Sequence, residues 1–227
     1  MLTTVDGIMI APDHLKRIAA WSRDLSEREI DIARAGISER SYRANEYIFM
    51  RGDEFEYWTG VVTGLARMGI VSRGGKAASF AGLTAGAWFG EGSVLKNEAR
   101  RYDVMALRDT RLALMDRKTF VWLFENSVAF NRFLVKQLNE RLGQFIAFLE
   151  YGRTLDATAR LARSIASLFN PILYPGDPPS RDHPGGDRGA VRYLAPERQP
   201  MPEAAGERRA APAGIWRGDR GRPRAAA

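Results

Sequence analysis

The spacing of apolar and polar positions divides the chain into a middle of short alternating runs and helical segments on either side. Residues 26–37 begin with Ser26 and carry Glu29 three positions later, the capping-box pattern that starts a helix. Over residues 41–115, short apolar or alternating runs are separated by glycine, which predicts several short strands. Proline is absent from residues 13–170, as expected of strands whose amides all donate to a ladder.

The run SRGGK, residues 72–76, is predicted to form a tight hairpin turn. Gly74 and Gly75 can adopt the positive φ values that such a turn requires between two antiparallel strands. The strands and helices together predict an α+β fold, an antiparallel β-roll of jelly-roll type with flanking helices.

Helices are predicted again after the roll. Asp116 can cap a first helix, and after a bend near Ser127 a long helix runs to about residue 153. Its apolar positions are spaced by four, four, three and four residues, like the seam of a coiled coil. The seam consists of Leu134, Leu138, Leu142, Phe145 and Leu149, with Lys136, Glu140 and Arg141 beside it. We expect this helix to pair with its copy in a homodimer; packing against its own roll is the alternative.

A shorter helix follows the long one. Asp156 is its expected N-cap, and Leu161, Ile165 and Leu168 form its apolar stripe. Pro171 and Pro175 then bracket a turn.

The pattern stops after Tyr174. Residues 176–227 contain 10 Arg, 10 Ala, 8 Gly and 8 Pro, and their only Val, Leu, Met and Ile residues are Val191, Leu194, Met201 and Ile215. This is too little apolar surface to bury a core, so we expect the tail to be disordered.

Charge and composition exclude several classes of function. The net charge of +7 divides into +4 over residues 1–175 and +3 over the tail. No apolar run approaches the roughly 18 residues of a membrane span, and the first residues lack the order of a signal peptide, so we expect a cytoplasmic protein without membrane contact.

The chain has no cysteine and two histidines, His14 and His183, so we expect neither an iron–sulfur cluster nor haem. Without a phosphate-binding Walker loop, a metal-spaced cluster or a nucleophile elbow, we expect no enzyme activity.

Two stretches carry a resemblance to a known family. RGDEFEYWTGVVTGLARM, residues 51–68, resembles the opening strands of a cyclic-nucleotide-binding domain. WFGEGSVLKNEARRYDVMALRDTRLALM, residues 88–115, is similar to its phosphate-binding cassette, in which Gly-Glu starts a short helix and an arginine follows about ten residues later. Together with the helices, the chain resembles the Crp/Fnr family of bacterial transcription regulators over roughly residues 15–175.

The resemblance implies an effector site at the cassette. Amides at the start of its helix would face an anion, a carboxylate would accept from ribose hydroxyls, and an arginine would hold phosphate. The downstream register indicates Arg100 as this arginine, and the spacing from the carboxylate indicates Arg101. The candidate effector-binding residues are Phe89, Gly90, Glu91, Gly92, Ser93, Arg100 and Arg101.

The chain departs from the cyclic AMP-binding members of this family. Those members place Ser or Thr after the arginine, where this chain has Arg101 or Tyr102. They also place a Thr-Ser pair on the long helix, where counting back from Asp156 reaches Phe145 and Ile146. Polar groups of a buried purine would go unpaired here, so cyclic AMP is one candidate for an effector that we leave open. A structural pair of Glu91 with Arg100, across an empty pocket, is the alternative.

Family members end in a winged helix-turn-helix that reads DNA, and this chain carries the Arg-rich tail at that place. Read one nucleotide later, codons for the residues from Arg181 onward permit EITQEEIGALSGISRQNANRC, which resembles the family's reading helices. We therefore interpret the tail as the product of a frameshift between about residues 174 and 181, in the gene or in its sequencing. An Arg-rich arm that binds nucleic acid without specificity is the rival interpretation.

The sequence thus predicts five regions: an N-terminal helical lead-in (1–25), a β-roll effector domain (26–125), a dimerisation helix (126–153), the first helix of a DNA-binding region (154–175) and a disordered tail (176–227). We expect a homodimeric transcription regulator of the Crp/Fnr type, with DNA reading lost in this chain. The alternative is a ligand-binding or dimerisation module without DNA output.

Overall fold

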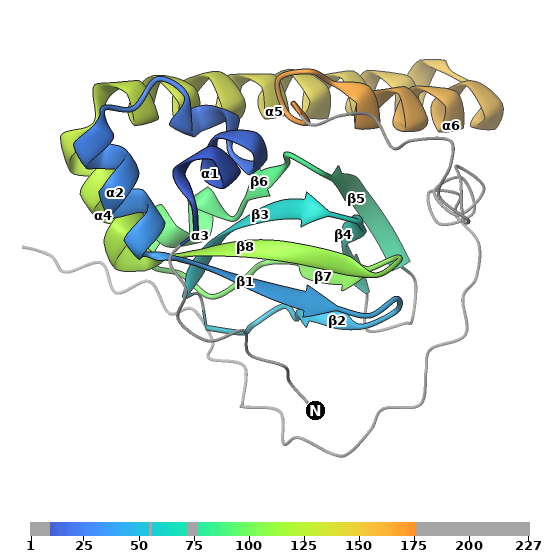
Figure 1. The fold of residues 1–227 in the computed structure, drawn as a ribbon. Coiled ribbons are helices and arrows are strands. Elements are labelled where there is room, and N and C mark those ends of the chain that lie inside the picture. The colour runs from blue at the N-terminus through green and yellow to red at the C-terminus, as the bar shows by residue number, and fades with distance from the viewer. Residues whose placement is uncertain (1–9, 55, 72–76, 176–227) are drawn as a thin grey trace, which may run out of the picture.

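The computed structural model describes residues 10–54, 56–71 and 77–175. It confirms the α+β class: eight strands form an antiparallel roll, and helices flank it (Figure 1). The predicted turn at residues 72–76 and the predicted disorder of residues 176–227 lie outside the described residues.

Two four-stranded sheets face each other in the roll. The first has the order β1 (Ile37–Tyr42), β8 (Thr110–Asp116), β3 (Tyr57–Thr63) and β6 (Trp88–Phe89). The second has the order β2 (Tyr47–Phe49), β7 (Asp103–Ala106), β4 (Leu65–Val71) and β5 (Ala77–Thr84). All pairings in both sheets are antiparallel, including that of β4 with β5, the two strands on either side of the predicted hairpin turn.

The helices begin where the local sequence predicts. The lead-in comprises α1 (Pro12–Ile18), a 3₁₀ helix η1 (Ala20–Ser22) and α2 (Glu27–Ala35). Ser26 and Glu29 form the expected reciprocal capping box at the start of α2. This agreement arises because a cap depends on residues within one turn of each other.

The C-terminal helices have the expected side-chain caps. They are α4 (Arg117–Asn126), α5 (Val128–Thr154), α6 (Ala157–Ala166) and a 3₁₀ helix η2 (Ser167–Phe169). Asp116 caps α4 and Asp156 caps α6. Ser127 ends α4 and caps α5, which places the bend where the sequence predicts it. Figure 1 shows α5 running along the top of the roll, with α6 beside its far end.

The core has two parts. An aromatic cluster joins the lead-in helices, the first sheet and the start of α5; its rings belong to Trp21, Trp58, Trp88, Phe120 and Phe130. The second cluster fills the interior between the two sheets with aliphatic and aromatic side chains. The aromatic cluster anchors α5 to the roll, because Phe130 and Leu134 of α5 are both buried in it.

The position of Leu134 corrects the predicted seam. Leu134 is 3% exposed in the core of its own chain, whereas the next residue, Val135, is 58% exposed. The exposed apolar stripe of α5 consists of Val128, Val135, Leu138, Leu142, Phe145, Ile146 and Leu149. Its members at 128, 135, 142 and 149 recur every seven residues, so the stripe has the expected period. Of the five predicted seam residues, Leu138, Leu142, Phe145 and Leu149 are exposed on it, and Leu134 is not.

Candidate effector site

The cassette contains β6 and the short helix α3 (Glu91–Lys96). Gly90 joins them with φ 94°, a left-handed conformation that glycine adopts without strain. Asn97 ends the helix, also left-handed, at φ 54°. The sharp turn at each end directs the chain back on itself and leaves Glu91 buried at the first helical position.

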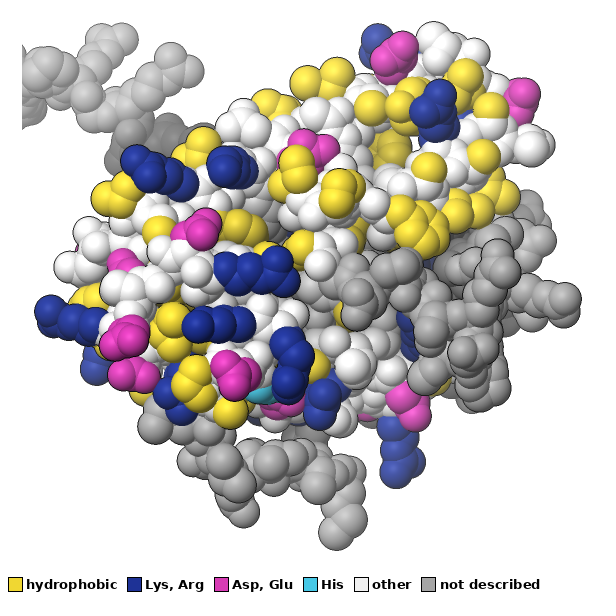
Figure 2. Space-filling model, turned by 45° about the horizontal axis from the view of Figure 1, so that its top comes forward, with side chains coloured by type: hydrophobic (Ala, Val, Ile, Leu, Met, Phe, Trp, Pro, Cys, Tyr) yellow, Lys and Arg dark blue, Asp and Glu magenta, His cyan; other side chains and the backbone are white. Residues whose placement is uncertain are grey.

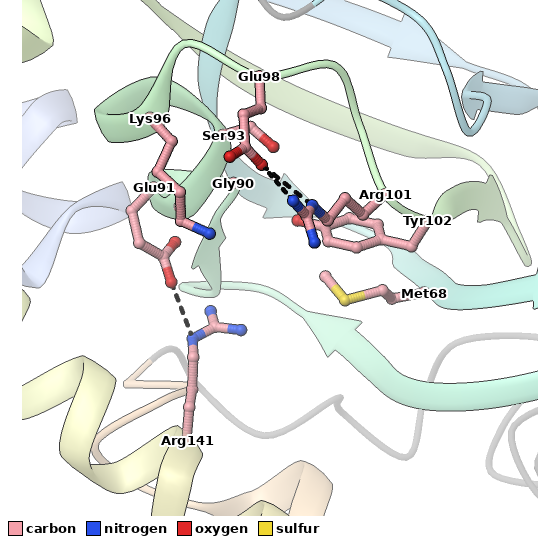
Figure 3. A pocket seen from close by; sticks show the side chains of 10 residues that line it. Met68, Gly90, Glu91, Ser93, Lys96, Glu98, Arg101, Tyr102 and Arg141 are labelled. Carbon is pink, nitrogen blue, oxygen red and sulfur yellow. Dashed lines mark hydrogen bonds and ion pairs between the residues drawn. The ribbon is translucent and has the colours of Figure 1, made fainter. Parts of the chain in front are cut away.

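A pocket of about 210 Å³ opens beside this helix (Figure 3). The cassette, β4, the start of β7 and α5 contribute its walls, and its lining residues are Met68, Gly90, Glu91, Gly92, Ser93, Lys96, Glu98, Arg101, Tyr102 and Arg141. Five of the seven predicted effector-binding residues therefore line one pocket: Gly90, Glu91, Gly92, Ser93 and Arg101. Phe89 and Arg100 do not line it.

The structure distinguishes the two candidate arginines. The Arg101 side chain is 72% exposed at the pocket, where two of its nitrogens donate to Glu98 Oε2 at 2.7 and 3.0 Å. Arg100 is buried, with its guanidinium carbon 3.3 Å from the centre of the Phe49 ring and a hydrogen bond to the Tyr57 carbonyl. Burial lowers the pKa of Arg100 to about 10, so it remains protonated at neutral pH. Of the two candidate arginines, Arg101 is therefore the one that lines the pocket.

The partner of Glu91 is Arg141 of α5. Glu91 Oε1 lies 3.6 Å from Arg141 Nε, and the Glu91 side chain is 8% exposed (Figure 3). The other carboxylate oxygen, Oε2, is buried and has no hydrogen-bond partner within the described residues. A ligand that donates a hydrogen bond, such as a hydroxyl, would satisfy this oxygen.

Arg141 also connects the pocket to the body of the protein. Its guanidinium donates to the carbonyl of Trp88, and Gln137, one turn earlier on α5, donates to the same oxygen. Trp88 is two residues before Gly90, so α5 is bonded directly to the strand that leads into the cassette. A ligand that moves Glu91 or Arg141 would therefore act on α5.

Arg141, Lys96, Glu98 and Met68 are pocket residues that sequence reasoning did not identify. For Arg141 a signal existed, since it is a charged residue beside an apolar seam. The apolar spacing places Arg141 on the flank of a coiled coil, because nothing local indicates that the roll faces it. Lys96 and Glu98 follow Glu91 within one cassette, and a count of charges near the motif would have found them.

Tyr102 occupies the position at which the family's cyclic AMP-binding members have Ser or Thr, counted from Arg101. Burial, and secondarily the negative charge of Glu91, raises the pKa of Tyr102 to about 12, so the phenol is neutral at physiological pH. Phe145 and Ile146 are 59% and 56% exposed on α5 and do not line the pocket. The pocket thus offers cations, a buried carboxylate and a phenol, a set suited to an anion that also carries hydroxyl groups.

No group of three or more His, Cys, Asp or Glu in residues 10–54, 56–71 and 77–175 is placed to hold a metal ion. Over the same ranges, no helix combines the length and the apolar character needed to cross a membrane.

Comparisons with known proteins agree with this geometry. Residues 39–127 match the cyclic nucleotide-binding domain family. The cyclic AMP receptor protein of Thermus thermophilus is 27% identical over 151 residues, which cover 66% of this chain and 70% of that protein. The crystal structure of the Thermus thermophilus catabolite activator protein has a TM-score of 0.51 at 26% identity, covering 66% of this chain and 70% of its own.

A structure from Ruegeria pomeroyi has a TM-score of 0.50 at 21% identity and covers 70% of this chain and 72% of its own; it supports the fold alone. The matched family, the fold and the clustered cassette residues converge on one conclusion. Residues 39–127 match the cyclic nucleotide-binding domain family, and the chain is similar over two thirds of its length to a Crp regulator.

Proposed function

We propose that this protein is a homodimeric regulator of the Crp/Fnr type whose roll binds a cyclic nucleotide. The observation that carries the proposal is the pocket at the cassette, where the buried Glu91 carboxylate pairs with Arg141 and Arg101 lines the same pocket. Glu91 Oε2 would accept from a ribose hydroxyl, and Arg101 would leave Glu98 to hold the phosphate. As a regulator of this type, the protein would work in the cytoplasm.

The same pocket leads us to expect weak discrimination between purines. Phe145 and Ile146, which stand where the resemblance implies a purine-binding Thr-Ser pair, do not line the pocket and have no polar group, and Tyr102 stands in place of a small hydroxyl side chain. A site that makes no hydrogen bonds to the base edge cannot reject the wrong base strongly. We therefore expect the dissociation constants of cyclic AMP and cyclic GMP to differ by less than about 10-fold.

Calorimetric titration of the full chain with each cyclic nucleotide tests this proposal. A charge-assisted hydrogen bond contributes about 1.5–3 kcal/mol, so Glu91→Gln and Arg101→Ala should each weaken binding by about 10- to 100-fold. Matched controls are Glu125→Gln and Arg132→Ala, exposed residues of α4 and α5 outside the pocket, which should bind like wild type. Binding that is absent in wild type, or unchanged in both pocket variants, would contradict the proposal.

We propose that the exposed apolar stripe of α5 pairs two copies of the chain. Four of its members, Leu138, Leu142, Phe145 and Leu149, are between 42% and 59% exposed. Figure 2 shows hydrophobic side chains gathered on the upper part of the molecule, over α5 and α6. A stripe with heptad spacing is typical of helices that bury it against a partner helix.

Sedimentation equilibrium tests this pairing. The wild type should be a dimer, and Leu142→Glu should be a monomer because the pair would bury two facing carboxylates. Lys136→Glu adds the same side chain at an exposed position beside the stripe and should stay a dimer. A monomeric wild type would rule out the pairing.

The DNA output of this chain is a separate proposal. We propose that residues 176–227, as printed, do not read DNA, and that a frameshift replaced a winged helix-turn-helix there. Sequencing the gene across codons 170–185 tests the frameshift. If the bases there encode no helix-turn-helix in any reading frame, the frameshift proposal is wrong. In a gel-shift assay at moderate salt, this chain should give no discrete sequence-selective complex. It would then act as a ligand-binding partner in heterodimers, which co-purification with a full-length paralogue would reveal.

A further inference from the structure

The chain returns to the roll after α6. Residues 167–175, here called the return segment, leave the end of α6, which Figure 1 shows beside α5. Asn170 holds the turn: its side-chain oxygen accepts from the amide of Leu173 at 3.0 Å, and its carbonyl accepts from the amide of Tyr174 at 2.9 Å. Its side-chain nitrogen donates to Glu140 of α5 at 2.6 Å.

Of the Leu, Ile, Phe and Tyr side chains of the return segment, three are buried and two are exposed. Leu168, Leu173 and Tyr174 are 8%, 3% and 7% exposed, whereas Phe169 and Ile172 are 48% and 47% exposed. The segment therefore presents one apolar face to the roll and another to the surface.

The buried face lies inside the roll, next to the effector pocket. Leu173 and Tyr174 belong to the same apolar cluster as Met68 of β4 and Phe89 of β6, and Tyr102 packs against that cluster. Met68 and Tyr102 also line the pocket, so the pocket and the return segment share a wall. Burial raises the pKa of Tyr174, and the charge of Arg141 opposes this shift, which is consistent with Tyr174 lying near the Arg141 side of the pocket.

The pocket that remains is too small for a whole nucleotide. Its volume is about 210 Å³, and sites for ligands of this size occupy about 300–1,000 Å³. Two of its walls are hard to move, because β4 is paired in a sheet and α5 is anchored in the aromatic core. The return segment does not itself line the pocket, but it packs against the cluster behind Met68 and Tyr102. It pairs with no strand in the described sheets, so it is the neighbouring element that can leave at the lowest cost.

We propose that the return segment is a plug in the effector site, and that binding of a cyclic nucleotide expels Leu173 and Tyr174 from the roll. This inference rests on the proposed function, since it names how that same site is regulated. Binding then requires an open state, and the apparent affinity falls by the fraction of molecules that are open. Expulsion would also release α6 and whatever follows it, which couples the ligand to the C-terminal part of the chain.

Truncating the buried face should raise affinity. In calorimetric titration with cyclic AMP and with cyclic GMP, Leu173→Ala combined with Tyr174→Ala should bind about 10- to 100-fold more tightly than wild type, because the plug loses most of its buried apolar area. The matched control, Phe169→Ala combined with Ile172→Ala, truncates the exposed face of the same segment and should leave affinity unchanged.

A reversible lock tests the plug without removing it. A Cβ at Gly82 of β5 would lie 2.4 Å from Cδ2 and 3.6 Å from Cγ of Leu168, so Gly82→Cys with Leu168→Cys brings two sulfurs within bonding range. The chain has no cysteine of its own, so this is the single disulfide that can form within it. The oxidised protein should lose nucleotide binding by at least about 10-fold, and a reductant should restore it. This comparison also remains decisive if the double alanine variant does not fold.

The outcomes separate the two proposals. If wild type and the double alanine variant bind equally, or the oxidised lock binds as well as the reduced one, the plug is ruled out and the nucleotide site stands. If no variant and no redox state binds either cyclic nucleotide, the proposed function fails and the plug fails with it. Tighter binding without Leu173 and Tyr174, together with loss of binding in the lock, supports the plug.

Discussion

Methionine in place of Arg141 would leave the Glu91 carboxylate buried without the cation that lies 3.6 Å from it. At that distance two unit charges attract by roughly 4–5 kcal/mol for an effective dielectric constant of about 20, before any cost of desolvation. Removing one partner of a buried pair typically costs about 3–5 kcal/mol. Because the Arg141 side chain is 23% exposed, we expect Arg141→Met to lower the free energy of unfolding by about 2–4 kcal/mol.

The opposite change should cost less. In Glu91→Met, Arg141 keeps its hydrogen bond to the Trp88 carbonyl and can turn toward water, so we expect a loss of about 1–2 kcal/mol. With both residues changed to methionine no charge remains buried, and the double variant should be more stable than Arg141→Met alone by about 1–3 kcal/mol.

Urea unfolding followed by tryptophan fluorescence measures this cycle, since Trp21, Trp58 and Trp88 lie together in the core. With an m-value of about 1–3 kcal/mol per molar urea, a loss of 3 kcal/mol shifts the midpoint by about 1–3 M. All variants should be compared at one protein concentration, because a dimer's stability depends on it. If the two single effects simply add in the double variant, the pair is not coupled and this reasoning about Glu91 is refuted.

Two further changes test the packing and the ionisation of the roll. Gly60→Ala would place a Cβ 2.4 Å from the buried Trp88 ring and should lower the free energy of unfolding by about 3 kcal/mol. Gly143→Ala meets no neighbouring atom in its exposed helix and should raise the free energy of unfolding by about 1 kcal/mol. Thermal melts measure both variants, and equal effects would contradict the close packing of Gly60 against Trp88. Because the pKa of Tyr102 is raised to about 12, its contribution to stability is complete below pH 10 and is lost as pH rises toward 12. Alkaline unfolding should therefore be less steep in Tyr102→Phe than in wild type, and superimposable curves would contradict this.

Local features of the fold were predictable because their causes are local. The caps at Ser26, Asp116 and Asp156 each involve a side chain and an amide three residues later, and the structure has all three. The bend at Ser127 has the same kind of cause. Apolar and polar residues that alternate in short runs separated by glycine indicated the strands, because this alternation shows which face of a strand can be buried.

Choices between adjacent residues were not predictable. Arg100 and Arg101 are both arginines at plausible spacing, and neighbouring side chains leave the backbone in different directions; the fold buries one against Phe49 and leaves the other at the pocket. Leu134 and Val135 differ in the same way, because the face of α5 that packs on the roll buries Leu134 and leaves Val135 exposed. The spacing of apolar residues predicts a stripe, whereas the burial of a residue in the chain's own core depends on what the helix packs against.

From the sequence alone came the α+β class, the roll, the caps, the heptad period of the long helix and the cassette around Glu91, since each depends on residue types at short spacing. The tertiary structure alone decided that Arg141 pairs with Glu91 from a distance of fifty residues, that Arg101 is the pocket arginine, and that Leu173 and Tyr174 enter the roll. The physical reason is that these contacts join segments far apart in the chain, and a contact of that kind forms only where packing of the whole core brings both partners together.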